Sequence, residues 1–186
     1  MKTINTFLPV FNGFYGTYFG NAIDSEEESI LDELELNSDQ VTFNTKQFTI
    51  DVAKECVGIF QDSFNRELGI KMNVTFDSIY SPKFYNFSND EIVVSIEISD
   101  EDLQTIKNAV KENEVEISEM IKDKYQSRDG FASATSTDFK DWMEDFENEH
   151  KFGTLLEMLS EVLQIVSEEE MIDRMIGNVS MNYTVN

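Results

Sequence analysis

The 186-residue sequence has very few of the residues on which most catalytic and metal sites depend. It contains one cysteine, so no disulfide can form within the chain, and one histidine, which excludes every metal motif that needs two histidines. Lysine and arginine number 14 against 37 aspartates and glutamates, which gives a formal net charge of −23. This shortage of cations excludes ordinary binding of nucleic acid through a basic face.

Phosphate-binding loops, membrane spans and export signals are also missing. The eight glycines form no P-loop and no dinucleotide fingerprint. No window approaches the roughly 18 uninterrupted apolar residues of a membrane span. Asn5, Asn12 and Gly13 break the first apolar stretch, which does not have the pattern of a signal peptide. We therefore expect a cytoplasmic protein with no membrane contact, no cofactor and no metal.

Apolar residues are nevertheless frequent enough for a packed core. Hydrophobic residues make up 40% of the chain, and its 15 phenylalanines argue against wholesale disorder, because disordered chains are poor in aromatics. The length favours a single domain over 1–186, and it leaves open a helical subdomain over 100–177.

Strands are predicted by alternating apolar residues and by aromatic, β-branched runs. Asn12-Gly13 between two such runs is a strong hairpin signal. The two apolar runs that follow the first long helix are expected to pair as adjacent antiparallel strands. The predicted strands cover 4–11, 14–19, 72–76, 92–98 and 179–185.

Helices are predicted by apolar residues at steps of three and four, with capping residues at their ends. Thr45 is expected to begin one that Gly69 ends, and Ser99 with Asp102 marks the start of another, with a break near Asn113. The predicted helices cover 24–39, 45–68, 100–126, 137–146, 155–166 and 167–177. For 24–39, a loop around one helical turn is the alternative. Together these elements predict an α+β fold, with a mostly antiparallel sheet of about five strands and four to six helices packed on it.

The acidic residues are not spread evenly along the chain. They gather in 24–39, 90–123, 138–149 and 157–173, mainly on predicted helices opposite apolar positions. A compact chain of this length is about 40 Å across, and duplex DNA carries about 23 charges over that length. Net charge alone therefore permits imitation of DNA. The candidate partner-binding acids are Asp24, Glu26, Glu27, Glu28, Asp32, Glu33 and Glu35 in the first run, and Asp141, Glu144, Asp145, Glu147 and Glu149 in a second.

The segment Ser81–Asp90 is the second candidate contact surface, because it combines three aromatic residues with proline, asparagine and aspartate. Phe84 and Tyr85 are its candidate partner-binding residues, and the alternative is a packed Ω-type loop that plugs the end of the sheet. A metal-dependent enzyme using Asp90 and neighbouring carboxylates is a third hypothesis. The single cysteine, Cys56, lies on the apolar side of a predicted helix and is expected to be a core residue.

Two stretches of the sequence resemble known proteins. Thr6-Phe-Leu-Pro-Val-Phe-Asn-Gly-Phe-Tyr-Gly-Thr17 and Ser81-Pro-Lys-Phe-Tyr-Asn-Phe-Ser-Asn-Asp90 resemble uncharacterised acidic proteins of bacteriophages and related mobile elements. In charge alone, the chain is also similar to anti-restriction and anti-CRISPR proteins that imitate DNA. These resemblances imply a chain that acts in the cytoplasm of a bacterial host.

The function expected from charge and resemblance is that of a non-enzymatic anti-defence protein. Its carboxylates would block the nucleic-acid groove of a restriction or CRISPR component, so the partner would be a basic nucleic-acid-binding protein or nuclease, and nucleic acid itself would not be bound. A homodimer is left open. The alternative is a protein-interaction module that uses the aromatic 81–90 segment, with the acidity incidental.

Overall fold

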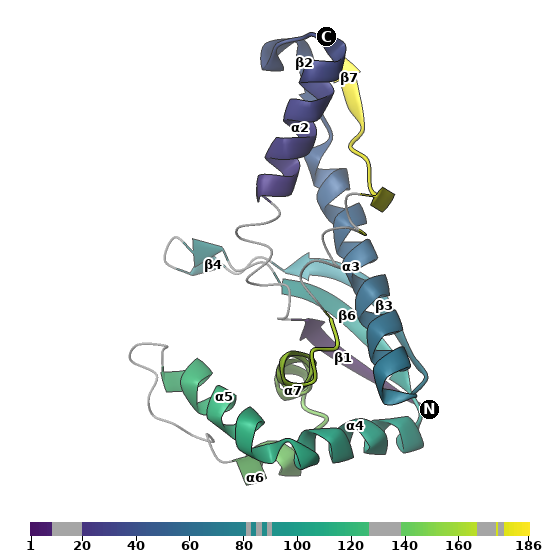
Figure 1. Cartoon of the computed structure of the whole chain (residues 1–186), viewed down its shortest axis with the longest axis vertical. Coiled ribbons are helices and arrows are strands. Elements are labelled where there is room, and N and C mark those ends of the chain that lie inside the picture. Colours follow the sequence, from purple (N-terminus) through teal and green to yellow (C-terminus); the bar gives the residue numbers. More distant parts are fainter. Residues whose placement is uncertain are drawn as a thin grey trace.

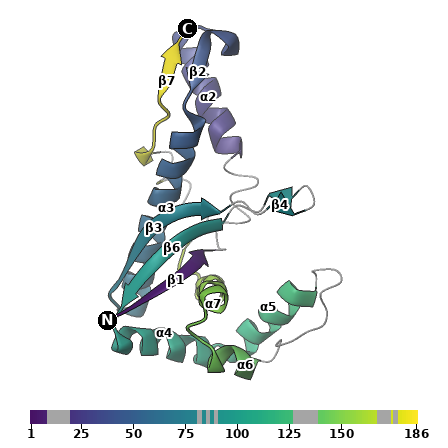
Figure 2. The ribbon, with the colours of Figure 1, turned by 180° about the vertical axis from the view of Figure 1, so that it is seen from behind.

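A three-stranded antiparallel sheet lies at the centre of the molecule, which is described here from a computed structural model. The structure describes residues 1–8, 20–80, 83–84, 87–88, 91–126, 139–166, 174 and 177–186. In the sheet, β6 (Glu91–Ile98) lies between β1 (Lys2–Leu8) and β3 (Met72–Tyr80) (Figures 1 and 2). The predicted antiparallel pairing of the strands at 72–76 and 92–98 is confirmed, with Val74 opposite Ile96.

One face of this sheet is buried and the other is open, as the alternating sequence predicts. Ile4 and Leu8 of β1 and the apolar residues at even positions of β6 are buried, whereas Asn5 and Glu97 are exposed or partly exposed on the other side. The buried residues of the sheet join Phe60 and Phe152, which come from two different helices, in one connected core.

Two helices cover the buried face of the sheet. Helix α3 (Thr45–Leu68) packs on β3, and α7 (Glu149–Val162) packs on β1. The end of α3 is as predicted, because Gly69 adopts the left-handed conformation (φ 64°) that glycine tolerates best. Its start differs by one residue: the side chain of Asn44, and not of Thr45, accepts the hydrogen bond from the Gln47 backbone N–H.

Helices α4 (Asp100–Glu112) and α5 (Glu114–Gln126) lie at one end of the molecule, together with α6 (Phe139–Glu144) (Figure 1). The predicted break at Asn113 is confirmed, because it is the C-cap of α4 and α5 starts directly after it. Ile106, Ile121 and Trp142 from these helices belong to the same buried cluster as the sheet. The organisation into one domain stays a prediction.

Ser99 caps α4, as the sequence predicts. Its Oγ accepts from the Asp102 backbone N–H at 3.0 Å and donates to the Asp102 carboxylate at 2.8 Å. We expect Ser99→Ala to lower the free energy of unfolding by about 1 kcal/mol, because the N–H at the helix start loses its acceptor. Chemical denaturation of the two proteins measures this difference, and an unchanged midpoint would show that the cap contributes nothing.

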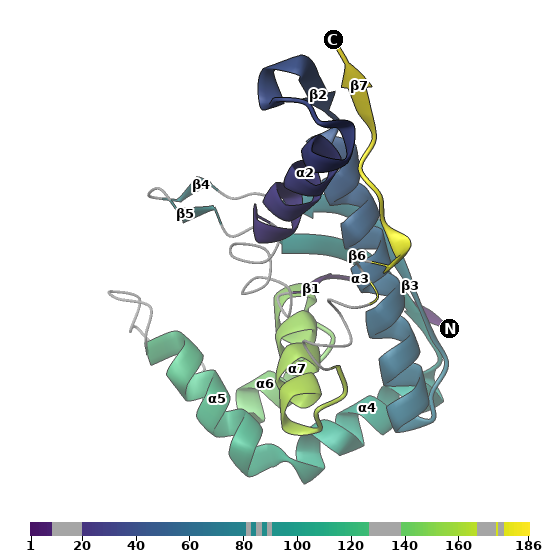
Figure 3. The same cartoon turned by 45° about the horizontal axis from the view of Figure 1, so that its top comes forward.

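The opposite end of the molecule is built from α2 (Gly20–Leu34), the short 3-10 turn η3 (Ser38–Gln40), and a ladder of β2 (Val41–Phe43) with β7 (Tyr183–Val185). Figure 3 shows this group from above, at the end of α3 that lies far from α4. Ile30 is buried and joins the main core, with Ile23 and Leu34 packed against it.

The single sheet of about five strands is wrong. The described residues form one three-stranded sheet and two separate two-stranded ladders, β2–β7 and β4 (Lys83–Phe84) with β5 (Phe87–Ser88). The last strand does not join the main sheet because it pairs with β2, a three-residue strand that is too short to show alternation. The α+β class and the number of described helices agree with the sequence.

Three further boundaries depart from expectation or cannot be compared. The first strand of the predicted hairpin, β1, pairs with β6, with Ile4 opposite Ile96. Its second strand, at 14–19, lies outside the described residues. Helix α7 begins at Glu149, six residues before the predicted start at 155, and it ends at Val162 and not at 166.

Candidate functional site

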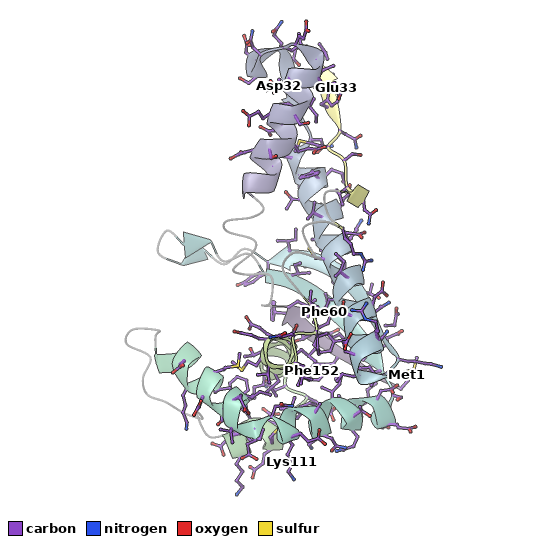
Figure 4. The ribbon with its side chains drawn as sticks, in the orientation of Figure 1. Met1, Asp32, Glu33, Phe60, Lys111 and Phe152 are labelled. Carbon is purple, nitrogen blue, oxygen red and sulfur yellow. The ribbon has the colours of Figure 1, made fainter. Side chains whose placement is uncertain are left out.

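The first acidic run forms an exposed surface on α2. Asp24, Glu28 and Asp32 are four residues apart, so they lie in a row along the helix, and all three are exposed. Ile30 lies on the opposite side, facing the core. Glu33 and Glu35 are also exposed, Glu35 directly after the end of α2, and Glu26 and Glu27 are half-buried at the flanks. We call these seven acids the α2 acidic surface; Figure 4 labels two of them, Asp32 and Glu33.

The charge density of this surface is comparable to that of nucleic acid. The six acids on the helix itself, from Asp24 to Glu33, span nine residue steps, which is about 13.5 Å at the helical rise of 1.5 Å per residue. Six charges over that length correspond to about one per 2.3 Å, between the values of about 3.4 Å for one DNA strand and about 1.7 Å for the duplex. The density therefore suits a groove that normally holds phosphates.

These charges are not compensated within the described part of the chain. The segment 20–40 contains eight acids, the seven of the α2 acidic surface and Asp39, and no lysine, arginine or histidine. No side chain among the eight forms an ion pair or a side-chain hydrogen bond with a described residue. Among the described residues, no ion pair therefore reduces the negative charge of this segment.

The positions of the acids also work against the helix that carries them. The first turn of α2 holds no acid, where the helix dipole would favour one, whereas Asp32 and Glu33 lie in its last turn. The i,i+4 pairs Asp24–Glu28 and Glu28–Asp32 repel, each at a cost of about 0.2–0.5 kcal/mol. Helices α4 and α5, in contrast, carry acids in their first turns. Helix stability therefore does not explain the acids of α2.

The second acidic run is largely neutralised by neighbouring lysines. Its members are Asp141, Glu144, Asp145, Glu147 and Glu149, and all five are exposed. Lys140 lies 3.7 Å from Glu144, Lys151 lies 3.2 Å from Asp145, and Lys2 lies 2.9 Å from Glu147. The hydrogen bond to Glu147 is the main cause that raises the pKa of Lys2 above its ordinary value. Three of the five carboxylates thus have a cation beside them.

The two acidic runs do not form one surface. Figure 4 places Asp32 and Glu33 at one end of the long axis and Lys111 of α4 at the other, and Figure 1 shows α6 beside that second end. The central sheet and most of α3 lie between them. The two acidic runs therefore present their charge at opposite ends of the molecule.

The aromatic segment 81–90 contains a small antiparallel ladder, with Lys83 opposite Ser88 and Phe84 opposite Phe87. This ladder, β4–β5, stands apart from the sheet in Figures 1 and 3. The Phe84 side chain, Tyr85 and Asp90 lie outside what the structure describes. The proposals that rest on them, a contact surface and a metal-dependent enzyme, stay predictions.

Cys56 is a core residue, because only 2% of it is exposed on the inner side of α3. Burial raises the pKa of its thiol to about 12. We expect no reaction with a thiol reagent at pH 8 while the protein is folded, because the reactive thiolate is absent, and full reaction of this one thiol after unfolding in denaturant. Labelling of the native chain within minutes would contradict the buried position.

Tyr183 and Val185, which belong to the predicted strand 179–185, are exposed at the α2 end of the molecule. Their exposed fractions are 43% and 51%. Alternation predicted that they share a face, but it could not show that this face is left uncovered by the described chain.

Comparisons with known proteins identify no relative. No protein-family model, curated protein or solved structure matches the chain. Among the described residues, no group of three or more histidine, cysteine, aspartate or glutamate side chains converges as metal ligands would. No described helix is both long enough and apolar enough to cross a membrane.

Proposed function

We propose that this chain is a binding protein whose α2 end occupies the cationic nucleic-acid groove of a partner protein. The carrying observation is the α2 acidic surface, which is exposed, uncompensated and placed where it costs helix stability. Carboxylates on α2 stand in for phosphates and pair with the lysines and arginines that line such a groove. The partner is therefore a basic nucleic-acid-binding protein or nuclease.

In its finer form, the proposal assigns the chain to anti-defence proteins of phages or mobile elements. The resemblance of Thr6–Thr17 and Ser81–Asp90 to phage proteins supports this source, and a restriction or CRISPR component would then be the partner. The chain acts without catalysis, since occupation of the groove is enough to exclude DNA or RNA.

The test is capture of partners from a bacterial lysate on the immobilised chain at low salt, followed by elution with duplex DNA. We expect the eluted proteins to be nucleic-acid-binding proteins, because the duplex competes for the same groove. Raising the salt from about 50 to 200 mM should release them as well, since pairing of exposed charges is screened. Captured proteins that resist both treatments would contradict the proposal.

A second candidate function rests on the β4–β5 ladder, which projects from the sheet as a contact element would (Figure 3). In this case the chain is an interaction module, and Phe84 and Tyr85 carry the binding. Replacing both with alanine would then abolish capture, whereas neutralising α2 would not. The opposite pattern supports the α2 end.

A further inference from the structure

We propose that the edge of β7 that no described segment covers is a docking site for an extended, lysine- or arginine-rich segment of the partner, which adds to the β2–β7 ladder as a third strand. This inference deepens the proposed function and rests on it for the charge of the partner. It names a second component of the α2 end, one that supplies backbone hydrogen bonds and apolar contacts.

The hydrogen-bond register shows which groups of β7 point outward. Asn44 N–H donates to the Asn182 carbonyl at 2.8 Å, and Asn186 N–H donates to the Gln40 carbonyl at 2.8 Å. Bonded and non-bonded pairs alternate in an antiparallel ladder. Tyr183 and Val185, which lie between the bonded positions, therefore direct their backbone N–H and C=O groups away from β2.

No described segment uses these outward groups. The ladder has only two strands among the described residues, and no backbone hydrogen bond of Tyr183 or Val185 to a described residue occurs outside it. Both side chains are among the few large hydrophobic residues left exposed. An edge with free backbone groups and exposed apolar side chains is the arrangement that strand addition uses.

The edge of β3 in the main sheet, unlike that of β7, has backbone groups that side chains of α3 occupy. The Asn65 side chain accepts from the Met72 N–H and donates to the Met72 carbonyl, and the Gln61 side chain accepts from the Val74 N–H. Farther along, a bulge shifts the register between Phe76 and Ser78. Such devices commonly block a strand edge. The sequence of β7, Tyr-Thr-Val, offers neither a charge nor a proline that would do so.

Charge decides the kind of segment that docks. Asn186 at the end of β7 donates to the backbone carbonyl of Asp39, which joins β7 to the connection that follows α2. An incoming strand thus lies at the same end as eight uncompensated acids (Figure 1). A second copy of this chain would bring the same acids and be repelled, whereas a strand with alternating basic and apolar residues matches both α2 and the exposed side chains.

The probe for this site is a synthetic peptide of about ten residues that alternates lysine and valine, long enough for one typical strand. Its controls are a glutamate–valine peptide and a lysine–valine peptide with proline at two central valines, which keeps the charge but cannot pair along a ladder. We expect the first to bind at low salt and both controls to bind at least tenfold more weakly.

The protein variant is Val185→Pro, which removes an outward N–H and leaves the hydrogen bonds of β7 to β2 their donors. Its matched control is Val185→Thr, which keeps both that N–H and the branched shape. Val185→Pro should weaken binding of the lysine–valine peptide by about tenfold or more, and Val185→Thr should stay close to wild type. In the wild-type chain, peptide binding should slow hydrogen exchange at the Tyr183 and Val185 amides. Because the exchange measurement uses only the wild-type chain, it tests the strand site even if the proline variant folds poorly.

The outcomes separate the two proposals. Equal binding by Val185→Pro, unprotected Tyr183 and Val185 amides, or no binding of the lysine–valine peptide overturns the strand site. If Asp24→Asn/Glu28→Gln/Asp32→Asn alone loses the peptide, the α2 proposal stands without the strand site. If Val185→Pro alone loses it, the strand site stands without the α2 proposal. A wild-type dimer that Val185→Pro dissociates would make a second copy the occupant and contradict the inference.

Discussion

Neutralising three carboxylates of α2 is expected to weaken partner binding by about a hundredfold while making the protein more stable. The variant is Asp24→Asn/Glu28→Gln/Asp32→Asn, which removes the exposed row without changing side-chain size. If each lost charge pair contributes about 1 kcal/mol at the interface, the sum corresponds to roughly a hundredfold in Kd. Relief of repulsion within α2 should raise the free energy of unfolding by about 1 kcal/mol.

The matched control for this variant removes the same number of charges at the other end of the molecule. Glu114→Gln/Glu116→Gln/Glu119→Gln on α5 changes three exposed acids that form no ion pair with a described residue. It should bind within about twofold of wild type. It should also be slightly less stable, because two of the three lie in the first turn of their helix. Equal loss of binding by both variants would mean that net charge, and not α2, determines affinity.

Gly153→Ala is expected to destabilise the protein strongly, although it adds only one methyl group. Gly153 lies in α7 where the helix packs on β1, and an added Cβ would overlap the Phe7 carbonyl oxygen and lie 2.6 Å from Thr6 Oγ1. Thr6 cannot move aside easily, because it is fully buried and its hydroxyl donates to the Glu149 carbonyl. We expect a loss of about 3 kcal/mol or more, since backbone and helix must separate.

Gly58→Ala in α3 is the matched control. A Cβ at Gly58 meets nothing within 4 Å, so only the helix propensity changes. This substitution should stabilise the protein by about 0.5–1 kcal/mol, the opposite sign from Gly153→Ala. Thermal unfolding of both variants measures the pair. A Gly153→Ala protein as stable as wild type would show that α7 does not lie directly against β1.

Local features of the fold could be predicted from the sequence, whereas long-range pairing could not. The stop at Gly69 and the cap at Ser99 depend on residues within one helical turn, and both are confirmed. The pairing of β1 with β6 joins residues about ninety positions apart, and nothing in either strand names the other as its partner. The short strand β2 has too few residues to show a period, so the β2–β7 ladder was missed.

In the candidate site, too, local features could be predicted from the sequence, whereas long-range contacts could not. Helical spacing predicted that the acids of 24–35 would face solvent on one helix, and α2 places most of them so. Their distance from the second acidic run depends on the path of the chain through α3. The neutralisation of that run depends on contacts such as Lys2 with Glu147, which are 145 residues apart. Spacing along the sequence therefore could not show that the second run has lysines beside it.

The central claim is that the α2 end occupies the nucleic-acid groove of a partner. Its most direct test is displacement of labelled duplex DNA from a captured partner, with fluorescence anisotropy as the readout. We predict that the wild-type chain releases the duplex at a fixed salt concentration of about 50 mM, where both the duplex and the chain bind the groove tightly. The α2 variant should need about a hundredfold more protein for the same release. Duplex DNA that stays bound at saturating wild-type chain, or that the α2 variant releases as readily as wild type, would contradict the account.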